Sequence, residues 1–267
     1  MTGLSEYSHL ISSVYHKLLN PKVLSLPIIE SKATCGACIQ VPRYENHLKC
    51  CTFHPFLPNY LVGKILLEEQ ESPSFISNVM KHKISNRVYA LPIGITAPIS
   101  YQVDFNKYKD KKFGKNPDWL CPYYNLQNQN CGIWENKGSV CTSFYCESSK
   151  GKKGKVFWEK SLNYLSYIEM AFAEEALVNL DFSPRQVSEQ LDFLNRKKAT
   201  REELKQDYLD AKLDQKLWNH YTDKQAFYIK CYEIVKKMER PAVQELMGDL
   251  GEKLENDFLK SGAIWSD

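Results

Sequence analysis

The cysteines are the residues of this 267-residue chain whose types and spacing point most clearly to chemistry. Cys231 lies in an apolar stretch with helical periodicity, where we expect a buried small hydrophobe. The other eight of the nine fall into two groups, one ahead of residue 52 and one after residue 120. Thiolates gathered in this way are typical ligands of zinc or of an iron–sulfur cluster. We predict a metal site held by Cys35, Cys38, Cys50, Cys51, Cys121, Cys131, Cys141 and Cys146.

The compartment decides whether grouped thiols bind metal or form disulfides. The N-terminal sequence has no basic start, no apolar core region and no small-residue cleavage site, so it does not resemble a signal peptide. We therefore expect a cytoplasmic protein, where structural disulfides rarely persist. Metal or redox chemistry is favoured over a disulfide framework for this reason.

The spacing within the first group restricts how many centres the thiols can form. Cys35-Gly-Ala-Cys38 places two thiolates on one side of a tight loop. Cys50 and Cys51 are adjacent, and in an extended segment their side chains point to opposite faces. Either they serve separate sites, or one is a ligand and the other packs. This geometry favours one composite centre that joins both groups over two independent zinc knuckles.

Residue spacing does not separate zinc from iron–sulfur, because sulfur-only ligands suit both. The second group lacks the short regular repeat of ferredoxins and the paired Cys-x-x-Cys of zinc ribbons. Aromatic residues interleaved with it would shield a cluster from solvent, or would be the core of a small domain. We expect an iron–sulfur cluster with a redox or catalytic role. The alternative is structural zinc in an interaction module without enzymatic activity.

Two titratable residues outside the thiol groups are further candidates. His54 follows Cys51 by three residues and is a possible ligand or proton donor, the alternative being a packed or hydrogen-bonded histidine. Glu169 shares an apolar helical face with Trp158 and Phe172, so we expect its carboxylate to be desolvated. It would act as an acid or base or as an acceptor for a ligand. The alternative is a hydrogen bond to a loop amide or a lysine.

The cysteine motif carries a family resemblance over about residues 35–150. The run WLCPYYNLQNQNCGIWENKGSVCTSFYC, preceded by the first group, resembles the YkgJ-type cysteine-cluster family of zinc- or iron-chelating proteins. The matching positions are Cys121-Pro122-Tyr123, Cys131-Gly132-Ile133-Trp134, Cys141 and Cys146.

This sequence departs from the family pattern around the third cysteine of that motif. Lys137, Gly138 and Ser139 replace the expected basic residue and proline, and Thr142 replaces an arginine. The resemblance therefore implies metal chelation but no role that needs those arginines. Some members of the wider family resemble flagellin lysine methylases, which implies iron–sulfur-dependent methyl transfer as one form of the catalytic role.

The pattern along the chain changes near residue 155. We predict an N-terminal helix and lead-in over 1–30, a cysteine-cluster metal-binding domain over 31–155 and a helical domain over 156–267. Leu10, Val14 and Leu18 have the spacing of a short amphipathic helix. The basic stretches 107–115 and 151–155 are expected to be solvated connections.

Helix-start signals predict the elements of the last part of the chain. Ser183-Pro184 predicts a helix over 185–194, and Thr200 with Glu203 forms a capping box that predicts another helix. Two further helices are expected over about 223–238 and 241–260. The fold class is mainly α, with an irregular cysteine-rich metal-binding N-terminal part packed on a C-terminal bundle of helices.

Composition and motifs exclude several functions. A net charge of +3 makes a nucleic-acid partner unlikely, and no apolar run approaches the ~20 residues of a membrane span. No Walker loop, nucleophile elbow, zinc-protease motif or Rossmann fingerprint is present. The expected partner is a protein or small molecule of unknown identity.

Overall fold

The protein is described by a computed structural model that covers residues 5–30, 44–45, 48, 51–71, 74–145 and 147–265, without the side chains of 69–71. It is mainly helical, as the sequence predicts, and its strands are two residues long. The chain divides into two compact units, each assembled from separate stretches. The first unit comprises Met1–Ile39, Trp134–Phe172 and Val235–Asp267, and the second comprises Gln40–Ile133 and Ala173–Ile234.

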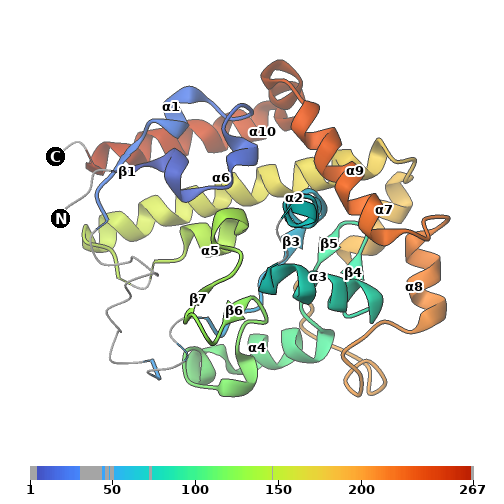
Figure 1. Cartoon of the computed structure of the whole chain (residues 1–267). Coiled ribbons are helices and arrows are strands. Elements are labelled where there is room, and N and C mark those ends of the chain that lie inside the picture. The colour runs from blue at the N-terminus through green and yellow to red at the C-terminus, as the bar shows by residue number, and fades with distance from the viewer. Residues whose placement is uncertain are drawn as a thin grey trace. The chain divides into compact units, whose positions relative to one another are not determined.

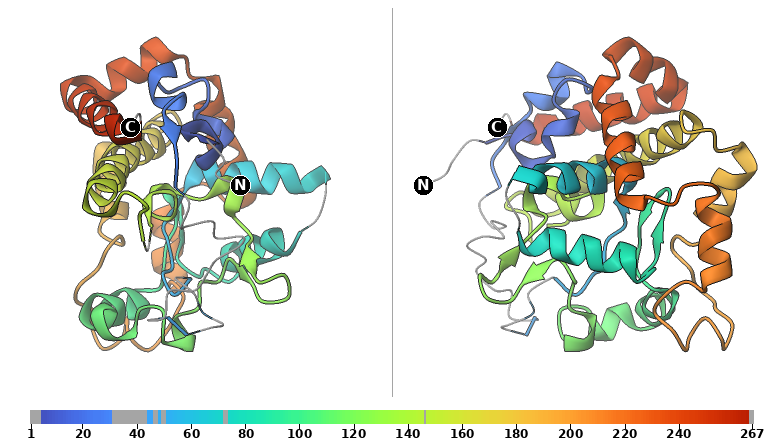
Figure 2. Two further views of the ribbon diagram at one scale, coloured as in Figure 1. Left: turned by 90° about the vertical axis from the view of Figure 1, so that its left-hand side faces the viewer. Right: turned by 45° about the vertical axis from the view of Figure 1, so that its right-hand side comes forward.

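The first unit is built on two long helices that lie side by side in Figures 1 and 2. They run antiparallel, because Tyr164 donates to Glu255 and Tyr167 donates to the Met247 carbonyl. Aromatic rings fill the space between them, with Phe157 5.2 Å from Phe258 between ring centroids. The elements are β1 (Ser5–Glu6) paired with β2 (Pro27–Ile28), α1 (Pro21–Leu24), α5 (Ser139–Ser143), the part of α6 (Gly151–Val178) up to Phe172, and α10 (Arg240–Ser261).

The second unit packs helices around a small antiparallel sheet in the order β3-β5-β4. Its strands are β3 (Leu57–Pro58), β4 (Ala90–Leu91), β5 (Gly94–Ile95) and the hairpin β6 (Tyr124–Asn125) with β7 (Asn130–Cys131). Its helices are α2 (Asn59–Glu71), α3 (Phe75–Ser85), α4 (Ile99–Lys112), α7 (Pro184–Leu191), α8 (Ala211–Trp218), α9 (Lys224–Lys237) and the end of α6.

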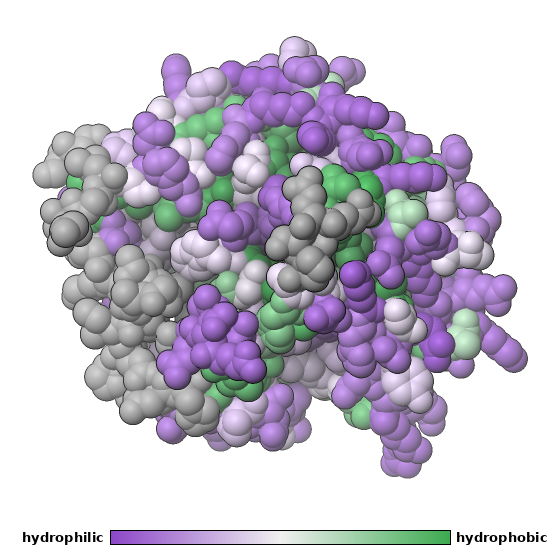
Figure 3. All heavy atoms as spheres, viewed as in Figure 1, coloured by the Kyte–Doolittle hydropathy of each residue, from purple (hydrophilic) through white to green (hydrophobic). Residues whose placement is uncertain are grey.

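Large apolar side chains fill the core of the second unit. Tyr60 and Leu61 of α2 are fully buried, as is Tyr228 of α9. Two large side chains of this core hydrogen-bond the backbone: Tyr228 donates to the Leu91 carbonyl and Trp218 to the Ala90 carbonyl. Hydrophilic side chains cover much of the face in view in Figure 3, with apolar residues between them.

Several helix predictions are confirmed. The apolar face that contains Trp158 and Phe172 belongs to α6 and is buried. Ser183 and Gln186 complete a capping box at the start of α7, with Pro184 in the first turn. α9 and α10 occupy the two later ranges, and α10 is broken by non-helical backbone at Gly248.

The prediction of one amphipathic helix near the N-terminus is wrong. Two 3₁₀ turns, Tyr7–Leu10 and Ser13–Tyr15, precede α1 there. Ser12 between them has extended backbone, and its hydroxyl donates to Asn136, a contact that interrupts a continuous helix. Val14 and Leu18 are nevertheless buried, so the apolar spacing identified the inward side chains correctly.

The basic stretches are not loops. Residues 107–112 lie in α4 and 151–155 begin α6, because lysine is a good helix former whose charged end stays in water. The chain turns only at 113–115. Aromatic contacts hold α4 in place: the rings of Phe105 and Trp119 lie 5.2 Å apart between centroids.

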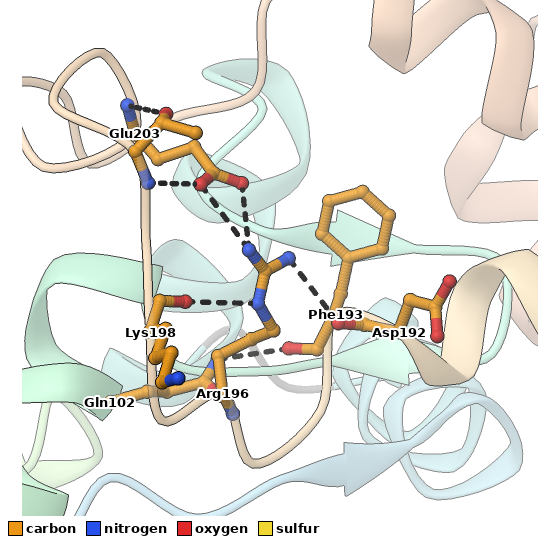
Figure 4. Close-up of polar contacts among 7 residues, drawn as sticks. Gln102, Asp192, Phe193, Arg196, Lys198 and Glu203 are labelled. Carbon is orange, nitrogen blue, oxygen red and sulfur yellow. Dashed lines mark hydrogen bonds and ion pairs between the residues drawn. The ribbon is translucent and has the colours of Figure 1, made fainter.

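The helix predicted after Thr200 does not form there. Thr200 and Glu203 make their reciprocal capping bonds, but the segment closes a single turn and α8 begins only at Ala211, capped by Asp210. Figure 4 shows why: the Glu203 carboxylate also receives the Arg196 guanidinium, at 3.1 and 3.2 Å. The Arg196 amide in turn donates to Gln102 of α4, so tertiary bonds hold this turn as a loop.

The close approach of α2 and α9 generates a stability prediction. A Cβ at Gly63 would lie 1.9 Å from the Tyr228 carbonyl oxygen, so Gly63→Ala should force the helices apart. We expect the free energy of unfolding in urea to fall by about 1–3 kcal/mol. Lys81→Ala, at an exposed position of α3, is the control and should change it by less than about 0.5 kcal/mol. Equal stabilities of the two variants would contradict this packing.

Candidate functional site

The structure describes half of the predicted ligands. Cys51, Cys121 and Cys131 belong to the second unit, and Cys141 belongs to the first. Cys51 and Cys121 carry free thiols. The predictions for the other four concern residues outside the described part of the chain: Cys35, Cys38, Cys50 and Cys146.

The two cysteine groups meet at Cys51 and Cys121. The Cys121 amide donates to the Cys51 carbonyl at 2.8 Å, so the end of the first group lies beside the start of the second. The Cys51 amide donates to the Leu48 carbonyl at 3.1 Å, which turns the chain just ahead of it. Residues far apart in sequence are thus joined through backbone atoms, as a shared site requires.

Tyr101 of α4 holds the segment that follows Cys51. Its hydroxyl donates to the Thr52 carbonyl at 2.8 Å and accepts from the His54 amide at 2.9 Å. The Thr52 hydroxyl accepts from the Gly114 amide, which ties the same segment to the turn after α4. Cys51 is therefore positioned by a rigid helix and not by its own loop alone.

The Cys121 sulfur lies in an environment suited to a thiolate ligand. The Tyr124 amide donates to the Cys121 carbonyl at 3.0 Å. Burial raises the pKa of its thiol to about 12, while the backbone N–H groups of Tyr123 and Tyr124 oppose that rise. Amide donors of this kind stabilise negative charge on cysteine sulfur in metal sites. A neutral thiol is disfavoured as a ligand, so this sulfur would ionise only with a metal or another cation beside it.

The β6–β7 hairpin brings Cys131 back towards Cys121. Cys131 pairs with Tyr124, and the Gly132 amide donates to the Tyr123 carbonyl at 2.8 Å. A negative charge on Cys131 would raise the Cys121 pKa further. Gly132 leaves room for α3: a Cβ there would lie 2.4 Å from a side-chain carbon of Ile76.

These contacts are pairwise and do not form a complete ligand set. Among the residues that the structure describes, no three Cys, His, Asp or Glu side chains gather closely enough to hold a metal ion. The chemistry of the donors nevertheless fits a thiolate-bound metal, since Cys51 and Cys121 are free thiols.

A buried histidine lies beside this group. His54 is 8% exposed and packs between Tyr101 and Tyr123, each 5.7 Å away between ring centroids. Its Nε2 atom has no hydrogen-bond partner among the described residues. Burial, and then the charge of Lys83, lowers its pKa well below the usual range, so the ring is neutral and resists protonation.

Lys83 and Tyr101 are parts of this site that the sequence analysis missed. Lys83 is 4% exposed, and burial lowers its pKa to about 8 against the opposing effect of Cys121. The signal was present, because Lys83 follows Ile76 by seven residues and so shares the buried face of α3. For Tyr101 no local pattern could have indicated that its hydroxyl holds the segment after Cys51.

In the first unit, Glu169 acts on the helix that carries Cys141. Its carboxylate accepts from the Ser139 amide at 2.6 Å and the Ser139 hydroxyl at 2.5 Å, and from Tyr15 at 3.3 Å. It therefore holds the start of α5. Desolvation is confirmed: burial raises the Glu169 pKa to about 7. The geometry corresponds to the alternative of a hydrogen bond to a backbone amide.

Glu30 joins the other ends of the two cysteine segments within the first unit. Its carboxylate accepts from the Ser149 amide at 2.6 Å and from the Ser148 hydroxyl at 2.8 Å. The Ser149 hydroxyl donates back to the Ile29 carbonyl at 2.9 Å. Glu30 precedes Cys35 by five residues and Ser148 follows Cys146 by two, so the two segments leave from neighbouring points.

No protein-family model, curated protein or solved structure matches the chain. The resemblance to the YkgJ-type family therefore stays a prediction that rests on the cysteine motif. Within the described residues, no helix combines the length and the apolar character needed to cross a membrane.

Removing the Tyr101 hydroxyl tests how Cys51 is held. Tyr101→Phe leaves the buried His54 amide and the Thr52 carbonyl without their partner. We expect unfolding free energy to fall by about 1–3 kcal/mol and alkylation at Cys51, mapped by mass spectrometry, to become faster. Tyr208→Phe, at an exposed ring, is the matched control. An unchanged Cys51 alkylation rate would show that Tyr101 does not position this segment.

The Glu169 carboxyl generates a pH prediction. Because its pKa rises from 4.5 unfolded to about 7 folded, the folded state holds the extra proton between these values. Stability should therefore fall as the pH rises through this window, by roughly 3 kcal/mol in total. Glu169→Gln keeps an acceptor but cannot ionise. The difference in urea unfolding free energy between the two proteins should shift in favour of the variant from pH 4.5 to 7, and a constant difference would refute this.

Proposed function

We propose that this chain is a cysteine-cluster metalloprotein that holds an iron–sulfur cluster with a redox or catalytic role. Cys51, Cys121 and Cys131 are the described residues that would hold it in the second unit. The sequence adds Cys141 of the first unit and the four cysteines outside the described residues: Cys35, Cys38, Cys50 and Cys146. The family resemblance adds methyl-transfer-like chemistry as one form of the catalytic role.

The observation that carries the proposal is the pair of contacts at the ends of the cysteine segments. In the second unit, the Cys121 amide donates a hydrogen bond to the Cys51 carbonyl. In the first unit, Ser148 and Ser149 donate hydrogen bonds to the Glu30 carboxylate. Each contact involves a cysteine or a residue within a few positions of one.

The size of the apolar core supports a redox or catalytic metal over a purely structural one. Tyr60, Leu61 and Tyr228 are among many fully buried side chains of the second unit. A unit with such a core does not need zinc merely to fold. An iron–sulfur cluster supplies one-electron transfer when bound, and the chain's own residues hold the sulfur ligands, exclude water and stabilise their charge.

Anaerobic purification of the full chain tests the metal directly. We expect a brown protein that absorbs at about 400 nm. It should contain iron and acid-labile sulfide in roughly equal amounts. A colourless protein with bound zinc would replace this proposal with a structural zinc module. A protein that binds neither metal under reducing conditions would overturn the thiolate centre itself.

Substitution of Cys121 tests the ligand assignment. Cys121→Ser should lower the metal content per chain several-fold and lower the thermal midpoint, because metal binding contributes to folding free energy. Cys231→Ser is the control: this cysteine is buried in α9, and its loss should leave the metal content unchanged. A severe loss of metal in the Cys231 variant would show that this residue was misassigned.

A further inference from the structure

The short helix α5 turns hydroxyl side chains towards the interior of the first unit. Its buried residues are Ser139, Thr142 and Ser143, none of which is a large hydrophobe. Val140 on the same helix is 38% exposed. A helix of five residues is not stable by itself in water, so contacts outside it must fix its position.

The long helix α6 holds α5 at both ends. The Glu169 carboxylate accepts from the amide and the hydroxyl of Ser139, the first residue of α5. The Ser161 hydroxyl forms a hydrogen bond of 2.9 Å with the hydroxyl of Ser143, the last residue of α5. Ser161 and Glu169 share a buried face of α6, because eight residues make slightly more than two turns. Figure 1 shows α5 alongside α6.

Cys141 lies midway between these two anchors. Ser139 precedes it by two residues and Ser143 follows it by two. Hydrogen bonds are directional, so anchors at both ends fix the rotation of α5 as well as its place. The Cys141 side chain is partly exposed, at the boundary between the buried and the exposed edge of the helix. A rotation of α5 would therefore redirect its sulfur.

Tyr7 completes the hydroxyl cluster around Ser161. Its hydroxyl lies 2.6 Å from the Ser161 hydroxyl, and both residues are fully buried. The Tyr7 ring packs edge-on against Phe258, 5.0 Å away between ring centroids. The bond from Tyr7 supports the core, whereas the bond from Ser161 to Ser143 reaches α5. Removing each bond separately therefore distinguishes the stability of the core from the position of α5.

We propose that Ser161 is a positioning residue for Cys141, which together with Glu169 clamps α5 and directs the sulfur towards a metal. This inference rests on the proposed function, in which Cys141 is a ligand, and adds a residue that lies outside the cysteine motif. Loss of the bond between Ser161 and Ser143 loosens Cys141 and weakens metal binding. Loss of the bond between Tyr7 and Ser161 lowers stability alone.

The test compares the full-length protein with Ser161→Ala and Ser143→Ala, which remove the bond to α5, and with Tyr7→Phe, the control that keeps it. The first readout is the alkylation rate at Cys141 in the reduced, metal-free protein, mapped by mass spectrometry. We expect a several-fold faster rate in both serine variants and an unchanged rate in Tyr7→Phe. All three variants should unfold at a lower temperature.

The second readout is the binding of Co²⁺, titrated in competition with a chelator and followed by the absorption that reports sulfur ligation. Both serine variants should bind Co²⁺ several-fold more weakly, and Tyr7→Phe should bind it as the original protein does. Combining Ser161→Ala with Ser143→Ala should add little, because both changes remove the same bond. If Ser161→Ala does not fold, Ser143→Ala tests that bond from α5.

The outcomes separate this inference from the proposed function. Equal Cys141 alkylation rates in the original protein and the serine variants would overturn the role of Ser161 and leave the metal site standing. Faster alkylation with unchanged Co²⁺ affinity would show that the clamp does not serve metal binding, which also overturns it. Equal effects in Tyr7→Phe would indicate a general loss of stability, with the same consequence. An original protein that takes up no Co²⁺ through sulfur would refute the metal site itself.

Discussion

The hydrogen bond from the Cys121 amide to the Cys51 carbonyl is the contact on which the candidate site depends. It joins the two cysteine groups through backbone atoms, whose positions are set by the elements around them. Tyr101 of α4 holds one side of this contact through Thr52 and His54, and the β6–β7 hairpin holds the other. A thiol on such a scaffold would be positioned before a metal bound, which would lower the entropic cost of binding.

Buried polar groups separate structural from functional positions in this protein. Glu169 is desolvated, but the Ser139 amide and hydroxyl and the Tyr15 hydroxyl satisfy its carboxylate. It therefore acts as an internal cap that orients α5 and Cys141. The His54 Nε2 atom is buried as well, but it has no hydrogen-bond partner within the described residues. His54 follows Cys51 by three residues.

The sequence predicted best where a few neighbouring residues determine the structure. The capping box at Ser183 and the apolar face of α6 depend on contacts within about one or two helical turns. The prediction of a helix after Thr200 was wrong although the capping hydrogen bonds between Thr200 and Glu203 formed. Arg196 binds the Glu203 carboxylate and donates its amide to Gln102, and these tertiary bonds hold the segment as a loop. Ser12 interrupts the expected N-terminal helix in the same way, through a bond to Asn136.

By itself, the sequence determined the mainly helical class, the division of the cysteines into two groups and the burial of Glu169. Residue type and periodicity suffice for these features, since they show which side chains avoid water. Only the tertiary structure decided that Cys51 meets Cys121, that Tyr101 holds the segment between Cys51 and His54, and that His54 packs between Tyr101 and Tyr123. Periodicity shows that a face is buried but not what packs against it, because that partner comes from a distant part of the chain.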